Sequence, residues 1–473
     1  MLSYQSIKRM LKATTIQSRL FYGLIILIIF LPLPLGSNRI WAWSIIEAWI
    51  FCLSALTIIS LLHRKITVPE HAKRCKLPLI SLAGFLAVSL FQLLPLNTAL
   101  PKSIDILNEH QWLLFSLDPY ATLQASIKTF SFLCLFILVV ILVNTEKRIK
   151  TVLMYFFLSG LFQAVYGSLM TLTEIEHIFF MEKYAYIGKA TGTFINRNHY
   201  ANYLILCIAA GTALLLMDIS NRKSSGIRDS LVGILHFIMS TKMLLRIGLA
   251  VCVVGIVLSQ SRMGNTSFFV SLSIAGFLWM LLTKRFTKKS FFLLASFIII
   301  DLFIVGQWFG FDEVQQRLQN TSAQAEKRDE VAKDTINYIK DYLLIGSGGG
   351  SYYSVYPNYQ SDDVRHFYKH AHNDYLQFLS EYGVIGTFFI ALFALSSTYI
   401  SLSTMIKRRN KTMQATAFCS LMVIIALLLH SSVDFSLQIT ANAASTVIII
   451  GLSWVACHLK SSRSGKARKR KSP

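Results

Sequence analysis

Residues 370–400 read HAHNDYLQFLSEYGVIGTFFIALFALSSTYI. An apolar run from Val384 to Ile400 follows a segment that contains two histidines and two carboxylates. Ionisable side chains at a membrane boundary are costly to keep, so they are functional candidates wherever they occur. If the stretch is one helix, His372 shares a face with Gly383, because successive residues turn by about 100°. The stretch therefore predicts a membrane-spanning helix with a catalytic-type base at its mouth and a seam of small residues below it.

The composition places the whole chain in the membrane class. Apolar residues make up 54% of the 473 residues, charged residues make up only 15%, and the mean hydropathy is +0.52. Soluble domains are less apolar and more highly charged. The apolar residues gather in twelve runs, most of them close to the roughly 20 residues that cross a bilayer as a helix. We therefore expect an all-α integral membrane protein with about twelve transmembrane helices. The runs cover residues 20–36, 41–62, 77–96, 124–143, 151–172, 199–217, 243–260, 264–283, 290–308, 376–403, 414–432 and 440–458.

The charges predict how this bundle lies in the membrane. Lys and Arg concentrate in every second connection, as the positive-inside rule requires of cytoplasmic loops, and acidic residues occupy the others. The net charge of +22 therefore reports topology and attraction to anionic lipid, and we expect no nucleic-acid partner. The predicted layout is a cytoplasmic N-terminus (1–19), spans one to nine (20–308), an extended periplasmic loop (309–372), spans ten to twelve (373–458) and a basic cytoplasmic tail (459–473).

This layout brings the unusual polar residues to one membrane face. Arg197 and His199 come just before the sixth span, and Arg262 lies between the seventh and the eighth. His372 begins the tenth span, and residues 430–442 link the last two. Counting spans and charges places all of them on the outer side, so we expect one site there.

Two arginines are the candidate anion ligands. The guanidinium of Arg197 or Arg262 stays charged and can hold phosphate oxygens in a bidentate fork. The alternative for Arg262 is an interfacial arginine that reaches lipid head groups, and for Arg197 it is an Asn-rich helix cap. The neighbouring Asn196, Asn198 and His199 are further candidate substrate contacts.

His372 is the candidate general base, because an imidazole titrates near neutral pH and suits proton transfer. His370 competes with it, and the spacing does not separate the two. The alternative for His372 is a polar residue at a helix start that is hydrogen-bonded to the long loop.

Weaker candidates surround these residues. The glycines of residues 346–350 could form a backbone nest for phosphate, or a tight turn that lets the loop lie on the bundle. An acid near a helix start can cap the helix or anchor a loop as well as touch substrate, and a surface arginine is solvated by default. The further candidate contacts are Asn373, Gly348, Gly349, Arg328 and Asp434.

The cysteines predict neither disulfides nor a metal site. All seven fall in predicted spans or an inner loop, and no pair has metal-ligand spacing. We therefore expect no cofactor and no metal ligands.

Four motifs occur in a recognisable order. They are GTFINRNH at 192–199, SQSR at 259–262, GSGGGSY at 346–352, and the segment 372–386 that opens with His372-Asn373. Together they resemble the O-antigen ligase and polymerase superfamily, which comprises bacterial membrane glycosyltransferases that use polyprenyl-diphosphate-linked glycans. The resemblance covers roughly residues 190–390.

The resemblance implies a metal-independent enzyme of the bacterial inner membrane. It would transfer a glycan from a polyprenyl-diphosphate carrier to a hydroxyl of a lipid, a protein or a growing glycan on the periplasmic face. Arg197 and Arg262 would hold the diphosphate, and His372 would activate the acceptor. The motifs serve a ligase and a polymerase alike, so this choice stays open. A small-anion transporter is the alternative of another class, but it calls for inverted repeats or broken helices, which the sequence does not show.

Overall fold

The computed structural model describes residues 4–94, 115–217, 241–284, 295, 328–362, 364 and 367–460. Nearly all of its regular structure is helical, and the one sheet in the described part is a hairpin of β1 (His177–Ile178) and β2 (Met181–Glu182). The α-helices are α1 (Tyr4–Phe30), α2 (Ile40–Leu62), α3 (Lys76–Phe91), α4 (Pro119–Leu142), α5 (Glu146–Leu172), α6 (Arg197–Met217), α8 (Thr241–Leu258), α9 (Arg262–Leu282), α12 (Arg328–Asp341), α13 (Tyr352–Val355), α14 (Asp374–Lys407), α15 (Lys411–His430) and α16 (Thr440–His458). Four single turns of 3-10 helix join them, at η1 (Leu35–Ser37), η2 (Ala72–Arg74), η3 (Tyr356–Asn358) and η4 (Ser436–Gln438).

The helices confirm an all-α membrane protein. Eight of those described are long and apolar enough to cross a membrane, and Thr15–Phe30 and Lys76–Phe91 are shorter apolar helices. Helices occur at eleven of the twelve predicted runs. The remaining run, 290–308, lies outside the described residues except for residue 295. The total of twelve spans therefore stays a prediction.

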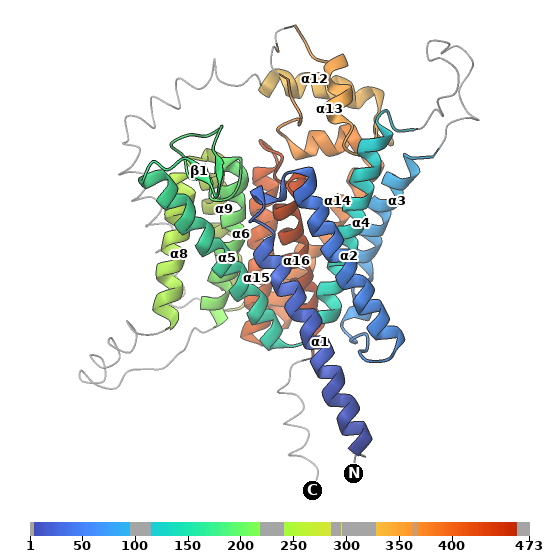
Figure 1. Ribbon diagram of the computed structural model, residues 1–473, viewed down its shortest axis with the longest axis vertical. Coiled ribbons are helices and arrows are strands. Elements are labelled where there is room, and N and C mark those ends of the chain that lie inside the picture. The colour runs from blue at the N-terminus through green and yellow to red at the C-terminus, as the bar shows by residue number, and fades with distance from the viewer. Residues whose placement is uncertain are drawn as a thin grey trace.

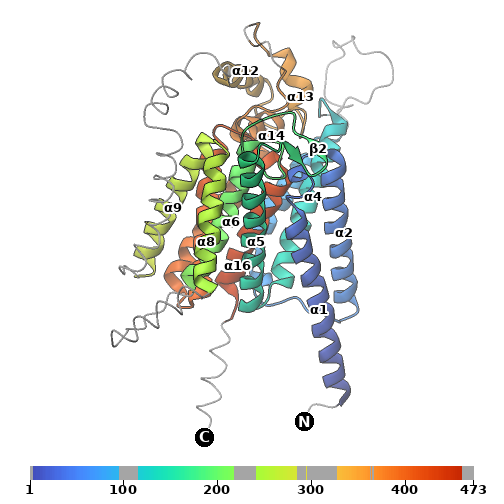
Figure 2. The ribbon, with the colours of Figure 1, turned by 60° about the vertical axis from the view of Figure 1, so that its left-hand side comes forward.

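The bundle is built around three central helices. The helices α6, α15 and α16 are buried over nearly their whole length, whereas α2 and α14 expose much of their surface. Figures 1 and 2 show α8 and α9 at one edge of the bundle and α2 at another. They also show α12 and α13 at the end opposite to the one at which α1 begins (Figure 1). We call this the α12 end, and α6, α9, α14 and α16 all begin there.

α14 differs from the continuous helix that the sequence predicts. It begins at Asp374, and the side-chain oxygen of Asn373 accepts hydrogen bonds from two backbone nitrogens of its first turn, at 3.0 Å and 3.2 Å. His372 therefore lies outside the helix, in a left-handed conformation with φ of 50°. Gly383, with φ of 61° and ψ of −171°, interrupts the helix. The predicted common face of His372 and Gly383 is wrong, because neither residue has helical geometry.

The predicted loop 309–372 is partly helical, because α12 and α13 lie within it. The segment 343–348 forms hydrogen bonds with the interruption of α14. The N–H of Val384 donates to the Leu343 carbonyl (2.8 Å), and the N–H of Gly348 donates to the Glu381 carbonyl (3.0 Å). The broken backbone of α14 is thus satisfied by the loop rather than by its own helix.

The interruption of α14 at Gly383 is a break in a spanning helix that the sequence analysis did not anticipate. A transporter of the inverted-repeat type would show a matching break in its other half. Among the spanning helices that the structure describes, α14 alone contains an internal residue with non-helical geometry. The single break is explained by the loop that bonds to it.

Candidate functional site

The two candidate arginines start two neighbouring helices. Arg197 is the first residue of α6, and Arg262 is the first residue of α9. The Ser261 hydroxyl donates to the amide oxygen of Asn198 at 2.8 Å, which ties the two helix starts together. The residues next to this bonded pair are the arginines themselves, so both emerge from the same corner of the α12 end. The Arg197 guanidinium lies over the ring of Tyr186, 5.6 Å from its centre.

A buried carboxylate lies between two histidines. His199 Nε2 is 3.7 Å from Asp434 Oδ1, and His372 Nδ1 is 3.8 Å from the same oxygen. Both separations are longer than a hydrogen bond, but they suit an ion pair. The exposed fractions of His199 and Asp434 are only 2% and 1%. Asp434 thus links α6 to His372, in the segment before α14.

An aromatic ring organises the same cluster. The Phe435 ring stacks on His370 at a centroid distance of 4.2 Å, and meets His199 and His372 edge-on at 4.7 Å and 4.9 Å. Three histidines from two segments of the chain therefore pack around one side chain. We call His199, His370, His372, Asp434 and Phe435 the histidine cluster.

The charge of Asp434 is set by its neighbours. Burial by itself raises the pKa of this carboxyl, but the proximity of His199 and His430 and the N–H of Phe435 (2.9 Å) outweigh it. The pKa of Asp434 is therefore held well below its usual range.

His370 and His372 have different surroundings, although the sequence spacing does not separate them. His370 Nδ1 lies 3.0 Å from the side-chain nitrogen of Gln377, which also donates to the Glu381 carboxylate at 2.9 Å. Burial, with smaller contributions from the charges of His199 and His372, lowers the pKa of His370 to about 3. His370 is thus neutral at physiological pH and fixed by a structural contact, whereas His372 faces Asp434.

Several buried polar atoms beside the cluster have no hydrogen-bond partner within the described part of the chain. These atoms are His199 Nε2, Asp434 Oδ2, His430 Nε2, Asn442 Oδ1 and both amide atoms of Asn202. A buried unsatisfied polar group costs about 1–3 kcal/mol. Their hydrogen-bonding capacity is available to water or to a bound ligand.

The glycine loop has no such capacity. The N–H of Gly348 donates to the Glu381 carbonyl, and the N–H of Gly349 donates to Gln92 Oε1 at 3.1 Å. The Glu381 carboxylate accepts from the N–H groups of Gly350 and Tyr352. These contacts favour the tight turn over the phosphate nest, because a nest needs N–H groups that point at an anion.

Other candidate contacts also have structural partners. Asn373 caps α14 and donates to the Ser432 carbonyl at 2.9 Å, and Arg328 donates to the Val433 carbonyl at 2.8 Å. The side chain of Asn196 accepts from the N–H of Asn198 at 2.8 Å, at the start of α6. These bonds favour roles as caps and loop anchors.

Sequence reasoning missed two contributors. Asp374, which is 1% exposed, accepts from the Ser431 hydroxyl at 2.9 Å and from the N–H of Leu437 at 3.1 Å, and so fixes the loop that presents Asp434. The ring of Phe435 packs against all three histidines of the cluster. The signal for Phe435 was the polar link 430–442, from which the sequence analysis singled out Asp434 alone; the signal for Asp374 was its place directly after Asn373 at the start of the helix.

The described residues contain no group of three His, Cys, Asp or Glu side chains that could hold a metal ion. Metal independence of the reaction stays an expectation from the family resemblance.

The comparisons with known proteins bear on the C-terminal half of the molecule. A family model described as O-antigen ligase matches residues 247–391. The matched segment contains Arg262, the glycine loop and His372. No curated protein matches the chain significantly. The family match confirms the resemblance to the O-antigen ligase and polymerase superfamily: the chain is a multi-pass membrane protein whose residues 247–391 match the O-antigen ligase family model.

Proposed function

We propose that this protein transfers a glycan from a polyprenyl diphosphate to an acceptor hydroxyl at the α12 end of the bundle. One observation carries the proposal. The bond between Asn198 and Ser261 brings the starts of α6 and α9 together, and the next residue of α6, His199, faces the same Asp434 oxygen as His372. The anion ligands Arg197 and Arg262 therefore lie at two paired helix starts, next to the histidine cluster that contains His372.

The donor diphosphate would bind at the paired helix starts. Each arginine offers a planar fork of N–H donors that matches phosphate oxygens. The N-termini of α6 and α9 add partial positive charge at the same corner. Arg197 and Arg262 would stabilise the charge that grows on the diphosphate as it leaves, without a metal ion.

His372 would act as the general base. Its imidazole takes the proton of the acceptor hydroxyl while the acceptor oxygen forms a bond to the anomeric carbon of the glycan. The bond between that carbon and the diphosphate breaks, and its electron pair leaves with the polyprenyl diphosphate. Asp434, ionised and 3.8 Å from His372 Nδ1, would stabilise the imidazolium that forms. The pKa of about 3 makes His370 too weak a base for this step.

The proposal places the α12 end in the periplasm and both chain termini in the cytoplasm of a bacterial inner membrane. The Lys and Arg bias of the connections at the other end supports this orientation. Reporter fusions at Lys150, at Ser361 and after the last residue should report inside, outside and inside. An inside report at Ser361 would place the histidine cluster on the wrong side for this reaction.

Deleting the gene tests the function and separates the two reactions of the family. The glycans of the deletion strain are resolved by size and by attachment. Loss of a ligase leaves long polymer on its polyprenyl carrier and an unmodified acceptor, whereas loss of a polymerase leaves single repeat units. Complementation with the wild-type gene should restore the pattern, and His372→Ala should not. An unchanged glycan pattern together with altered uptake of a small anion would instead support the transporter.

A further inference from the structure

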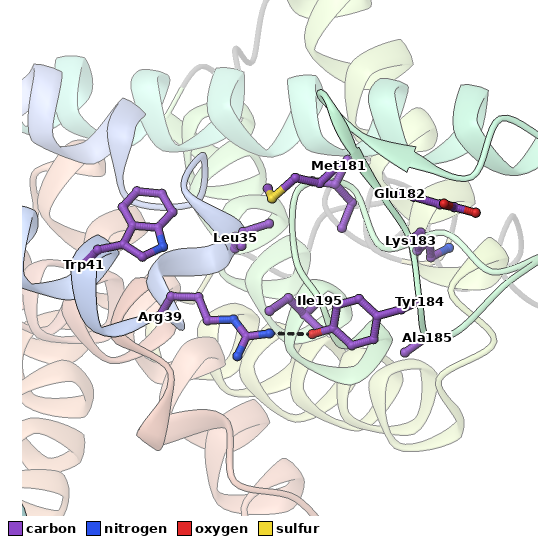
Figure 3. A pocket seen from close by; sticks show the side chains of 10 residues that line it. Leu35, Arg39, Trp41, Met181, Glu182, Lys183, Tyr184, Ala185 and Ile195 are labelled. Carbon is purple, nitrogen blue, oxygen red and sulfur yellow. Dashed lines mark hydrogen bonds between the residues drawn. The ribbon is translucent and has the colours of Figure 1, made fainter.

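A pocket of about 200 Å³ lies beside the arginine corner and plays no part in the chemistry proposed above. It opens between η1 with the start of α2 on one side and the β1–β2 hairpin with the segment after it on the other (Figure 3). Its walls are mostly apolar: Leu35, Trp41, Ile178, Met181 and Ile195.

One uncompensated cation lies at this pocket. Arg39 is exposed, and its guanidinium donates to the Tyr184 hydroxyl at 2.7 Å (Figure 3). Arg39 has no carboxylate within ion-pair distance among the described residues. The other cation of the lining, Lys183, is neutralised by Glu176 at 2.9 Å, and Glu182 also belongs to the lining, on the side away from Arg39 (Figure 3). The pocket is thus an apolar recess with one positive charge available to a ligand.

A single segment of chain separates this pocket from the proposed diphosphate site. Tyr184 and Ala185 line the pocket, and the following residue, Tyr186, lies under the Arg197 guanidinium. Ile195 also lines the pocket, two residues before Arg197. A ligand with its anionic group at Arg197 can therefore place an adjoining apolar group in the pocket.

The pocket also lies at a lipid-facing surface. The hairpin packs on the outward flank of α5, where Phe162, Tyr166 and Phe179 stack in a row. Phe180 at the hairpin tip is fully exposed, and Trp41 is 53% exposed. Exposed aromatic side chains at this level are typical of the membrane–water interface. A lipid chain has direct access from the side.

We propose, on the basis of the proposed function, that this pocket holds the isoprene units next to the diphosphate of the polyprenyl donor, with Arg39 as a third cation for the diphosphate. A volume of 200 Å³ equals that of about seven water molecules at roughly 30 Å³ each, which is room for a short apolar segment. The pocket would fix the first part of the chain and so set the position of the bond that breaks.

The test compares two probes on the purified full-length protein: farnesyl diphosphate, which has an isoprenoid chain, and inorganic diphosphate, which has none. Wild-type protein should bind farnesyl diphosphate at least about tenfold more tightly, because a few buried methylene groups suffice for that difference. Ala185→Trp fills the pocket, so it should remove this preference and leave inorganic diphosphate binding unchanged. Ile187→Trp adds the same ring to the same loop outside the lining and should keep the preference. Arg39→Gln should weaken binding of both probes.

Equal binding of the two probes by wild-type protein would overturn the proposal, and so would a full preference in Ala185→Trp. If Ala185→Trp also loses the binding of inorganic diphosphate, the two probes are compared on Met181→Trp, which fills the pocket from the opposite wall. A full preference for farnesyl diphosphate in Met181→Trp would then overturn the proposal. Failure of the proposed function gives a different result: Arg197→Gln and Arg262→Gln would then bind inorganic diphosphate as tightly as wild type, whatever the pocket variants do.

Discussion

Two polar regions at the α12 end use their hydrogen-bonding groups in different ways. In the glycine loop, residues 346–350, the backbone N–H groups donate to other parts of the protein, and Glu381 accepts several of them. In the histidine cluster, buried atoms such as His199 Nε2 and Asp434 Oδ2 have no hydrogen-bond partner among the residues that the structure describes. Both regions carry motifs of the same family, but only the histidine cluster has capacity left for a ligand.

The comparison separates residues that shape a site from residues that act in it. A satisfied polar network rigidifies the structure, whereas unsatisfied buried groups are a cost that folding alone does not explain. Changes in the histidine cluster should therefore reduce activity at normal protein levels. Changes in the glycine loop should reduce the amount of folded protein.

The largest expected effect is that of His372→Ala. Removal of a general base lowers a rate by about 10²–10⁴-fold, and His372 is 23% exposed and lies outside the helical part of α14. Glycan transfer in the complemented deletion strain should fall to that extent while the membrane level of the protein stays normal. The matched variant His370→Ala should retain more activity. Wild-type transfer by the double variant would rule out both histidines as the base.

Arg262→Lys should lower transfer by roughly tenfold to a hundredfold. Lysine keeps the charge but cannot form the two parallel hydrogen bonds of a guanidinium, and a hydrogen bond to a charged group contributes about 1.5–3 kcal/mol. The measurement is the rate of glycan transfer at matched protein level. Arg74→Lys, at the opposite end of the bundle, is the control and should behave as wild type. Equal rates for the two variants would mean that Arg262 serves only to reach lipid head groups.

Gly383→Ala should lower the stability of the protein, in contrast to the two variants above, which affect the rate of transfer. The residue has a positive φ, and an added Cβ would lie 2.4 Å from the carbonyl of Leu344, which is backbone and cannot move aside. Strain of this kind costs about 1–3 kcal/mol, so the melting temperature and the membrane level should both fall. Gly188→Ala is a matched control, because Gly188 also has a positive φ (71°) but has open space around it. A larger loss of stability at Gly188 would contradict this account of the break.

The last expected effect concerns the pH dependence of stability and is absent at neutral pH. The pKa of His370 is about 3 in the folded protein and ordinarily 6.5, so between these values the unfolded chain binds a proton that the folded protein does not. Stability should therefore fall as the pH drops from 6.5 towards 3. Thermal melting of the purified protein between pH 4 and 7 should show a weaker dependence for His370→Gln, which retains a polar partner for Gln377. Identical slopes for the two proteins would show that His370 does not remain neutral.

Hydropathy and charge alone predicted much of this architecture, because spans of about 20 apolar residues leave few alternatives to a helix. The convergence of Arg197, Arg262 and His372 at one end followed from counting helices. The cap at Asn373 and the break at Gly383 did not follow, because both depend on partners brought by the fold: the segment around Ser432 and the loop at Leu343. The periodicity of apolar residues predicts an unbroken helix through both positions.

The sequence also did not predict that His199 and His372 lie on either side of Asp434. The three residues are far apart in the sequence, and each has an ordinary role as a cap or a loop residue. Topology predicts which end of a bundle a residue occupies, but side-chain packing around Phe435 decides which residues meet.

The interruption at Gly383 also fixes how much of α14 must match the hydrophobic thickness of the bilayer. The part from Val384 to Lys407 has 24 residues, which rise about 36 Å at 1.5 Å each and exceed a hydrocarbon layer of about 30 Å. The preceding residues 374–382 are therefore not needed to cross it. Asp374 and Glu381 can then remain at the level of the lipid head groups, where their carboxylates cost far less than in hydrocarbon.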